Sequence, residues 1–248
     1  MNYKEWEEWG RDPDSESRCN IQRVRGYLSH MESAKQLVKL IANVYEPEMK
    51  ILDVGCNVGH YLSALRTKFP DLEYTGVDAY ENYINIAKEE FSKDSHAHFE
   101  VKDIFEPIFS DSPFDIVFCC NVLLHLPDFR LPVKNLLAST KKICLIRTLL
   151  DDYTNLVKSP TDNLYNDEGN PKHFWYFNTW EKSYFIDFIN KIGWNVELIE
   201  DEFKPENIQQ EFDKIKAHPA DKATRILNGK QIVENIIFNW VWIKITRK

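Results

Sequence analysis

The sequence predicts an α/β fold in which a mostly parallel sheet carries helices on both faces. The first observation behind this prediction is that short apolar runs alternate with amphipathic helical stretches from residue 50 onward. Such alternation is typical of βαβ units. The second is that some runs, such as Ile116-Val117-Phe118, are apolar without interruption. Strands buried on both faces of a sheet have this pattern.

The elements follow in order along the chain. The first 45 residues are expected to be helical apart from a polar loop at 11–20, with an apolar strip at helical spacing made of Met31, Ala34, Leu37, Val38, Ile41 and Val44. Strands are expected at 51–54, 74–77, 98–101, 114–119, 143–147, 195–199 and 236–245. Helices are expected at 60–69, 80–91, 131–139 and 181–192. Asn178 or Thr179 is the expected cap of the last helix, and Gly193 is placed to end it.

Two segments interrupt the alternation, at 149–178 and 201–235. The first is rich in Asp, Asn, Pro and aromatic residues, and the second is polar and expected to be helical, with Ile208, Phe212 and Ile215 on one shallow apolar face. Long insertions in a compact domain usually act as lids or binding loops. No repeat, low-complexity tract or linker divides the chain, so one domain spanning 1–248 is predicted.

Composition limits the possible functions. Lys and Arg number 31 against 39 Asp and Glu, and the resulting net charge of -8 counts against a protein that grips a nucleic-acid backbone. The apolar runs are far shorter than the roughly 18 residues that a membrane span needs. The N-terminus lacks the apolar block of a signal peptide, so a cytoplasmic protein is expected. The five cysteines have no C-x-x-C spacing, and no metal site is predicted.

The stretch from Ile51 to His60 carries the chemistry. An apolar strand ends in an acid, and a glycine-containing turn then leads into a helix, which lets a ligand approach the backbone and helix-start N–H groups. Several nucleotide-binding folds share this arrangement. A dinucleotide fingerprint starting at Gly55 would need glycine at 57 and 60, and a P-loop would need a lysine after Gly59; both patterns fail.

At these residues the sequence resembles the class I S-adenosylmethionine-dependent methyltransferases. Asp53-Val54-Gly55-Cys56-Asn57-Val58-Gly59 is similar to the family's acid-x-Gly-x-Gly-x-Gly loop, with Asn57 at the middle glycine. Asparagine tolerates positive φ better than other non-glycine residues, so the turn is expected to persist. Three further motifs follow in the family's order, Gly76-Val77-Asp78, Val101-Lys102-Asp103-Ile104 and Phe114-Asp115-Ile116-Val117 leading to Asn121-Val122-Leu123-Leu124-His125-Leu126.

The resemblance implies a Rossmann-like sheet of seven strands, one of them antiparallel near the end, with S-adenosylmethionine as cofactor and S-adenosylhomocysteine as product. It implies a helical lid at 1–45 and a cofactor-binding core at 50–147. Asp78 is expected to bind the ribose hydroxyls, with a helix N-cap as the alternative, and Asp103 the adenine amino group, with a capping aspartate as the alternative. The full set of expected cofactor contacts is Asp53, Gly55, Cys56, Asn57, Gly59, Asp78, Ala79, Asp103, Ile104 and Asn121.

The reaction is harder to derive, because a sulfonium donor is already activated. His125 is the best candidate for a general base, and the alternative is a histidine that holds the loop before Pro127. His173 and Tyr176, in an aromatic run that packing alone could explain, are candidates for acceptor contact. The two insertions favour transfer to oxygen or nitrogen of a small molecule. An RNA methyltransferase and an inactive cofactor-binding partner subunit are the alternatives.

Overall fold

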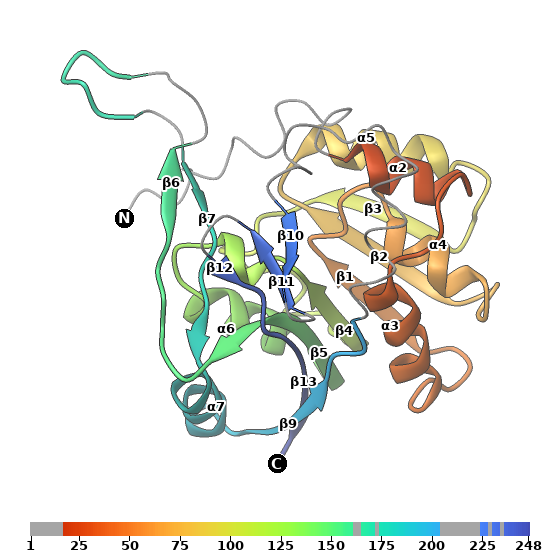
Figure 1. Cartoon of the computed structure of the whole chain (residues 1–248). Helices are drawn as coiled ribbons and strands as arrows, with labels where there is room; N and C mark the ends of the chain where they lie inside the picture. The colour runs from red at the N-terminus through yellow and green to blue at the C-terminus, as the bar shows by residue number, and fades with distance from the viewer. Residues whose placement is uncertain (1–16, 161–164, 172–173, 204–223, 228–229, 234–235) are drawn as a thin grey trace.

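The central sheet of the computed structural model runs in the order β3-β2-β1-β4-β5-β13-β9 (Figure 1). The structure describes residues 17–160, 165–171, 174–203, 224–227, 230–233 and 236–248. The first five strands of this order are parallel, and β13 is antiparallel to both of its neighbours. The seven strands are Lys50–Val54 (β1), Glu73–Asp78 (β2), Ala97–Val101 (β3), Phe114–Cys120 (β4), Thr140–Asp151 (β5), Trp194–Glu200 (β9) and Trp240–Arg247 (β13). The predicted seven-stranded, mostly parallel sheet is confirmed, and a two-residue strand, Trp180–Glu181 (β8), adds to the end of β5.

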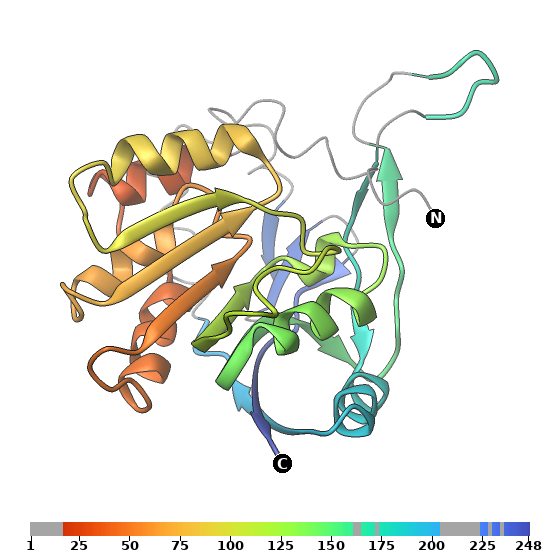
Figure 2. The ribbon, with the colours of Figure 1, turned by 180° about the vertical axis from the view of Figure 1, so that it is seen from behind.

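Helices cover both faces of this sheet (Figures 1 and 2). They are Arg18–Val24 (α2), Glu32–Ala42 (α3), His60–Arg66 (α4), Glu81–Glu90 (α5), Arg130–Ala138 (α6) and Lys182–Lys191 (α7). One core cluster joins the sheet to α3, α4 and α5, and the other joins it to α6 and α7. Ile116 belongs to the first cluster and its neighbour Val117 to the second, because successive strand residues point to opposite faces. Both faces are therefore buried, as the uninterrupted apolar runs predict.

Several boundaries differ from the sequence prediction, and three of the differences concern the N-terminal helix, the cap of α7 and the last strand. Helix α2 begins at Arg18, inside the expected loop at 11–20, of which residues 11–16 lie outside the described residues. The cap of α7 is Glu181, whose carboxylate accepts the N–H groups of Ser183 and Tyr184, so the expected cap at Asn178 or Thr179 is wrong. Asn178 is buried, and its amide already binds Leu126 O and the Val157 N–H. The expected strand at 236–245 is divided into Ile236–Ile237 (β12) and β13.

The two insertions contain short β-structure where they are described. Lys158–Pro160 (β6) and Phe174–Tyr176 (β7) pair as an antiparallel ribbon in the first. The second contains Thr224–Leu227 (β10) and Lys230–Val233 (β11), which form an antiparallel sheet with β12. The helical prediction is therefore wrong there. The sequence between Leu227 and its partner Lys230 is Asn-Gly, the pair typical of a two-residue hairpin turn. The expected apolar face at 208–215 lies outside the described residues.

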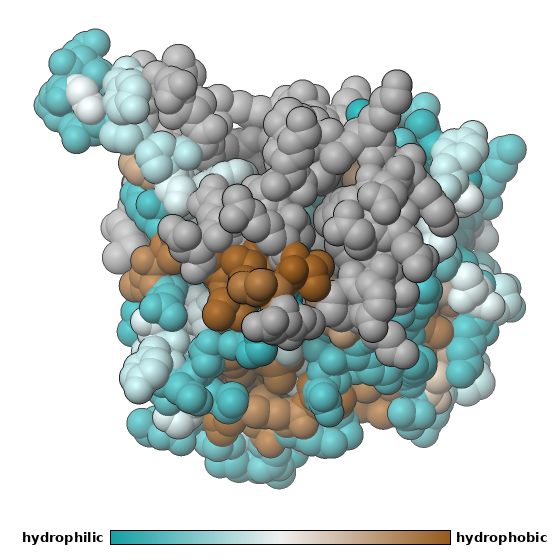
Figure 3. All heavy atoms as spheres, viewed as in Figure 1, coloured by the Kyte–Doolittle hydropathy of each residue, from teal (hydrophilic) through white to brown (hydrophobic). Residues whose placement is uncertain are grey.

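The small β10-β11-β12 sheet leaves apolar side chains on the surface. Leu227 and Ile237 are exposed, and apolar residues gather at the centre of the face drawn in Figure 3. None of the described residues of this sheet belongs to either core cluster, so the sheet is an addition to the main fold. The helix Leu123–His125 (η2) is a single 3-10 turn that follows β4.

Candidate functional site

A pocket of about 260 Å³ opens where β1, β2 and β4 end at their carboxyl termini. Ligands of open α/β sheets bind at this edge. The sequence-predicted residues that line it are Gly55, Asn57, Asp78, Ala79, Ile104, Asn121 and His125. The first insertion's Tyr176 and the loop residues Asp53, Cys56, Gly59 and Asp103 do not belong to the lining, and His173 lies outside the described residues. Most of the predicted set therefore meets at one cavity.

The glycine-containing loop has the backbone that its sequence predicts. Gly55, Asn57 and Gly59 have φ values of 80°, 51° and 81°. Asn57 therefore adopts the left-handed conformation expected of it. A Cβ atom at Gly55 would lie 2.2 Å from Cγ2 of Val122, so no side chain fits between this loop and the turn after β4. The loop backbone consequently forms one wall of the pocket without side chains in the way.

Asp78 links this loop to the next one. It ends β2, and its Oδ2 accepts the Asn57 N–H at 2.9 Å while Oδ1 accepts the Tyr80 N–H at 3.1 Å. Tyr80 itself occupies the N-cap position of α5, so Asp78 is not the cap. Burial raises the pKa of Asp78 to about 6, although the hydrogen bonds from Asn57 and Tyr80 oppose the shift. The carboxylate thus joins two loops that both line the pocket.

Asp53, Cys56 and Gly59 belong to the loop but do not line the pocket. Asp53 is 1% exposed, and its Oδ2 accepts a hydrogen bond from Tyr74 Oη at 2.7 Å. Burial raises the pKa of Asp53 to about 8, against the lowering effect of the Tyr74 hydrogen bond. Its Oδ1 is buried and has no hydrogen-bond partner among the described residues. Gly59 begins α4 at its N-cap, and Cys56 is fully buried.

Asp103 and Ile104, which follow β3, differ in where their side chains lie. Ile104 lines the pocket, whereas Asp103 Oδ1 accepts the Phe105 N–H at 2.9 Å within its own turn. That contact closes a turn and caps no helix, because no helix begins there in the described structure. Its contact with an adenine amino group stays a prediction.

His125 lies in η2, half-buried, at the rim between the pocket and the first insertion. Its Nδ1 is 2.9 Å from the carbonyl oxygen of Tyr176. A carbonyl only accepts hydrogen bonds, so Nδ1 carries the proton and Nε2 of the neutral ring carries the lone pair. Burial lowers the pKa of His125 to about 4, and the ring is therefore neutral at pH 7. Tyr176 thus meets His125 through its backbone.

Several lining residues were not singled out from the sequence. His60 is the first residue of α4, and its Nδ1 is buried with no hydrogen-bond partner among the described residues. Burial lowers the pKa of His60 to about 3. Asn20 of α2 donates to Asn57 Oδ1 at 3.4 Å and brings the N-terminal helix onto the loop. His60 could have been found, because it directly follows Gly59 at a helix start; Asn20 carries no such signal.

The pocket has features that fit an adenosyl cofactor with an amino-acid tail. Gly55 provides a close backbone approach, Asp78 is a buried carboxylate on the lining, and the buried Nδ1 of the lining residue His60 lacks a protein partner in the described structure. Across the described ranges, no group of three or more His, Cys, Asp or Glu side chains is placed to hold a metal ion. Within the same ranges, no helix combines the length and the apolar character needed to cross a membrane.

Comparisons with known proteins find a methyltransferase domain in this chain's sequence. Residues 52–143 match the family model described as a methyltransferase domain. Phosphoethanolamine N-methyltransferase 1 of Arabidopsis thaliana is 29% identical over 144 residues, which are 55% of this chain and 28% of the relative. The Plasmodium falciparum phosphoethanolamine N-methyltransferase is 30% identical over 77 residues, 31% of this chain and 29% of the relative. The chain thus spans less than a third of the length of these curated relatives.

Solved structures share the fold at low sequence identity. Magnesium protoporphyrin IX methyltransferase (ChlM) from Synechocystis PCC 6803 with bound SAM has a TM-score of 0.57 at 13% identity, covering 96% of this chain and 95% of the other. A second structure of that protein holds SAH. The [4+2]-cyclase SpnF also has a TM-score of 0.57, at 15% identity, covering 96% and 94%. One fold therefore carries different chemistries, and activity has to be argued from the site.

The sheet order and the pocket at the ends of β1, β2 and β4 define the Rossmann-like class I methyltransferase fold. Within this fold, residues 52–143 match the methyltransferase-domain family model. The resemblance to S-adenosylmethionine-dependent methyltransferases, first recognised in the loop motifs, is confirmed.

Proposed function

We propose that the protein is an S-adenosylmethionine-dependent methyltransferase that acts on oxygen or nitrogen of a small-molecule acceptor. The observation that carries this proposal is the single pocket that joins the glycine loop, Asp78, Ile104 and Asn121, inside the region matched by the methyltransferase family. Asn20 and Met31 also line the pocket, which supports a role for 1–45 as a lid. That residues 1–248 form one domain stays a prediction.

The proposed cofactor contacts follow from position. Asp78 accepts hydrogen bonds from the ribose, Ile104 packs on the adenine, and Asp103 accepts from the adenine amino group. Asp53 and Gly55 border the methionine portion, whose carboxylate can use the N–H groups at the start of α4, and Asn121 lies beside the methionine end. When bound, S-adenosylmethionine supplies a methyl group on an activated sulfonium. The chain's own contribution is to position the two substrates and exclude water.

His125 is proposed as the general base. Its proton lies on Nδ1 toward the Tyr176 carbonyl, so Nε2 is the basic nitrogen of the neutral ring and is proposed to accept a proton from the acceptor. A neutral ring at pH 7 is the form required, and burial maintains it. The base is needed only for acceptors that arrive protonated, such as an ammonium or a hydroxyl.

The acceptor side is proposed to be the aromatic series next to His125. His125 and Phe177 have ring centroids 5.1 Å apart, and Phe177 continues through Phe238 to Trp240 at 6.0 Å and 5.3 Å. Trp175 joins Phe177 at 5.4 Å. Half-buried aromatic faces suit a small cationic amine through cation–π attraction. Because two relatives are phosphoethanolamine N-methyltransferases, phosphorylated and free amino alcohols are the first acceptors to test.

The decisive experiment has two stages. Isothermal titration with S-adenosylhomocysteine and S-adenosylmethionine tests the pocket, and the absence of binding up to millimolar concentration would overturn the proposal. Formation of S-adenosylhomocysteine is then measured with a panel of amines, phosphoethanolamine and hydroxyl acceptors. Cofactor binding with no acceptor-dependent turnover would instead favour a binding module without chemistry.

A further inference from the structure

Arg147 is a buried cation close to the pocket. It lies near the carboxyl end of β5, and its Nε and Nη2 bind Asp201 Oδ2 and Oδ1 at 2.6 Å and 3.1 Å. The two side chains are 4% and 5% exposed. The remaining nitrogen, Nη1, donates to Asn121 Oδ1 at 2.5 Å, and the guanidinium lies 3.9 Å from the ring centroid of Trp240. Every nitrogen of Arg147 is thus engaged by a specific partner.

Asn121 lines the pocket and is bonded directly to Arg147. Its φ is 62°, a left-handed conformation that is uncommon for a residue with a side chain. Its N–H donates to the Arg147 carbonyl at 2.9 Å, so the two residues are joined through both backbone and side chain. Its Nδ2 donates to Tyr61 Oη at 3.4 Å. Both ends of the Asn121 side-chain amide are therefore held by the protein. Asn121 begins the turn that leads to Val122, and Val122 packs against Gly55.

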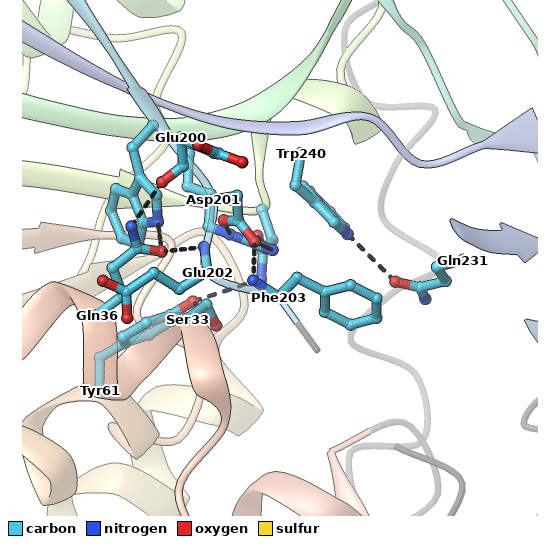
Figure 4. Close-up of polar contacts among 12 residues, drawn as sticks. Ser33, Gln36, Tyr61, Glu200, Asp201, Glu202, Phe203, Gln231 and Trp240 are labelled. Atoms are coloured by element: carbon cyan, nitrogen blue, oxygen red, sulfur yellow. Dashed lines mark hydrogen bonds and ion pairs between the residues drawn. The ribbon is translucent and has the colours of Figure 1, made fainter. Parts of the chain in front are cut away.

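The backbone on either side of Asp201 is bound by Gln36 of helix α3. Gln36 Nε2 donates to the Glu200 carbonyl at 2.8 Å, and Gln36 Oε1 accepts the Glu202 N–H at 2.9 Å. Figure 4 shows Asp201 between Gln36 and Trp240. With the backbone bound on both sides of it, Asp201 points its carboxylate toward Arg147. The first residues of the second insertion are thus anchored to the same group that holds Asn121.

Stability alone is a poor reason to keep such a pair. Taking two charges out of water carries a desolvation cost similar in size to the energy that their attraction regains, so a buried ion pair is weak evidence for stabilisation. Its geometric specificity is a better reason, because a planar guanidinium bridges a carboxylate and an amide in one fixed arrangement.

We propose that Arg147 is a positioning residue for cofactor binding: paired with Asp201, it holds Asn121 in the conformation that lines the pocket and ties the pocket to the start of the second insertion. The inference rests on the proposed cofactor site. Arg147 acts through Asn121 and does not itself line the described pocket.

The first test compares two arginine-to-lysine variants. In R147K a lysine supplies one point charge and cannot bridge Asp201 and Asn121 together. Arg66 provides a matched control, because its Nε and Nη2 bind Asp94 Oδ2 and Oδ1 at the same 2.6 Å and 3.1 Å, and its Nη1 binds carbonyl oxygens. We expect R147K to raise the Kd for S-adenosylhomocysteine about tenfold. R66K is expected to lose stability while its Kd stays within about twofold of wild type.

A double-mutant cycle tests whether Arg147 acts through Asn121. If it does, R147K adds nothing to the Kd of N121A, and the double variant binds like N121A alone. Additive effects would overturn the proposal. D201N is a second variant that keeps the bonds of Arg147 to Asn121 and the acceptor for the Phe203 N–H but removes the partner charge. We expect D201N to weaken binding by about fivefold, and an unchanged Kd would overturn the role of the ion pair.

These outcomes are distinct from failure of the proposed function. Wild-type protein that does not bind S-adenosylhomocysteine refutes the cofactor site itself. Wild-type protein that binds while R147K and R66K behave alike refutes only the positioning role.

Discussion

Replacing Gly55 by alanine tests how closely the cofactor loop packs on the turn after β4. The added Cβ would lie 2.2 Å from Val122 Cγ2, about 1.3 Å inside the distance of 3.5 Å at which carbon atoms make contact. A side chain at a φ of 80° adds a backbone cost of about 1–2 kcal/mol. Forcing Val122 aside adds a further cost of about 1–3 kcal/mol. We therefore expect G55A to lose about 2–5 kcal/mol of unfolding free energy and to lose cofactor binding.

Two companion variants separate the backbone cost from the steric cost. G193A isolates the first, because Gly193 has a φ of 92° and nothing within 4 Å of an added Cβ. V122A removes both γ carbons and leaves Val122 Cβ, 3.5 Å from the new atom, as the nearest contact. The double variant G55A/V122A should therefore lose less stability in urea denaturation than the sum of its parts. Strict additivity, or a G55A no less stable than G193A, would refute the reasoning.

Three further variants probe the site. D78N places an NH₂ group against one of two backbone N–H donors. We therefore expect it to lose about 1–3 kcal/mol of unfolding free energy, measured by urea denaturation, and to bind S-adenosylhomocysteine more weakly. Unchanged values in both measurements would contradict the role of Asp78. Asp53 has a folded pKa near 8, above its unfolded value, so its stabilising contribution is present below about pH 4 and is lost as pH rises through about 8. D53N should flatten this fall in unfolding free energy between pH 5 and pH 8.5, and an identical slope would exclude Asp53 as its source. H125N should lower kcat at least about 100-fold with little change in cofactor Kd. The acid limb of the wild-type kcat/KM profile should lie near pH 4, the pKa of His125. A limb near pH 6.5 would exclude His125, with its lowered pKa, as the base.

The sheet and its cofactor edge could be predicted because their signals are local. Continuous apolar runs such as Ile116-Val117-Phe118 indicate strands buried on both faces, and acids or glycines at the strand ends mark the edge where ligands bind. The left-handed Asn57 was expected from its residue type. The prediction succeeded wherever a few neighbouring residues determine the conformation.

The remainder depends on contacts between distant parts of the chain. Asn178 looked like a cap, but tertiary hydrogen bonds to Leu126 and Val157 use its amide, and Glu181 caps the helix instead. Asp78 and Asp103 each accept the N–H group two residues further along the chain, yet only Asp78 lines the pocket, where its second oxygen also accepts the distant Asn57 N–H. The pairing of Arg147 with Asp201 joins residues 54 positions apart and has no local signature. Such contacts have to be observed in the folded chain.

The place of β13 in the sheet has a consequence for the order of assembly. Strand β9 joins the main sheet only through β13, which is synthesised some forty residues later and inserts between β5 and β9. During translation the five parallel strands can pair as they emerge, but β9 has no partner until residues 240–247 have left the ribosome. Asp201 directly follows β9, so the anchoring of the second insertion to Arg147 is expected to be among the last events of folding. Nascent chains arrested before β13 should therefore contain the cofactor half of the sheet with the region around Asp201 still sensitive to proteases.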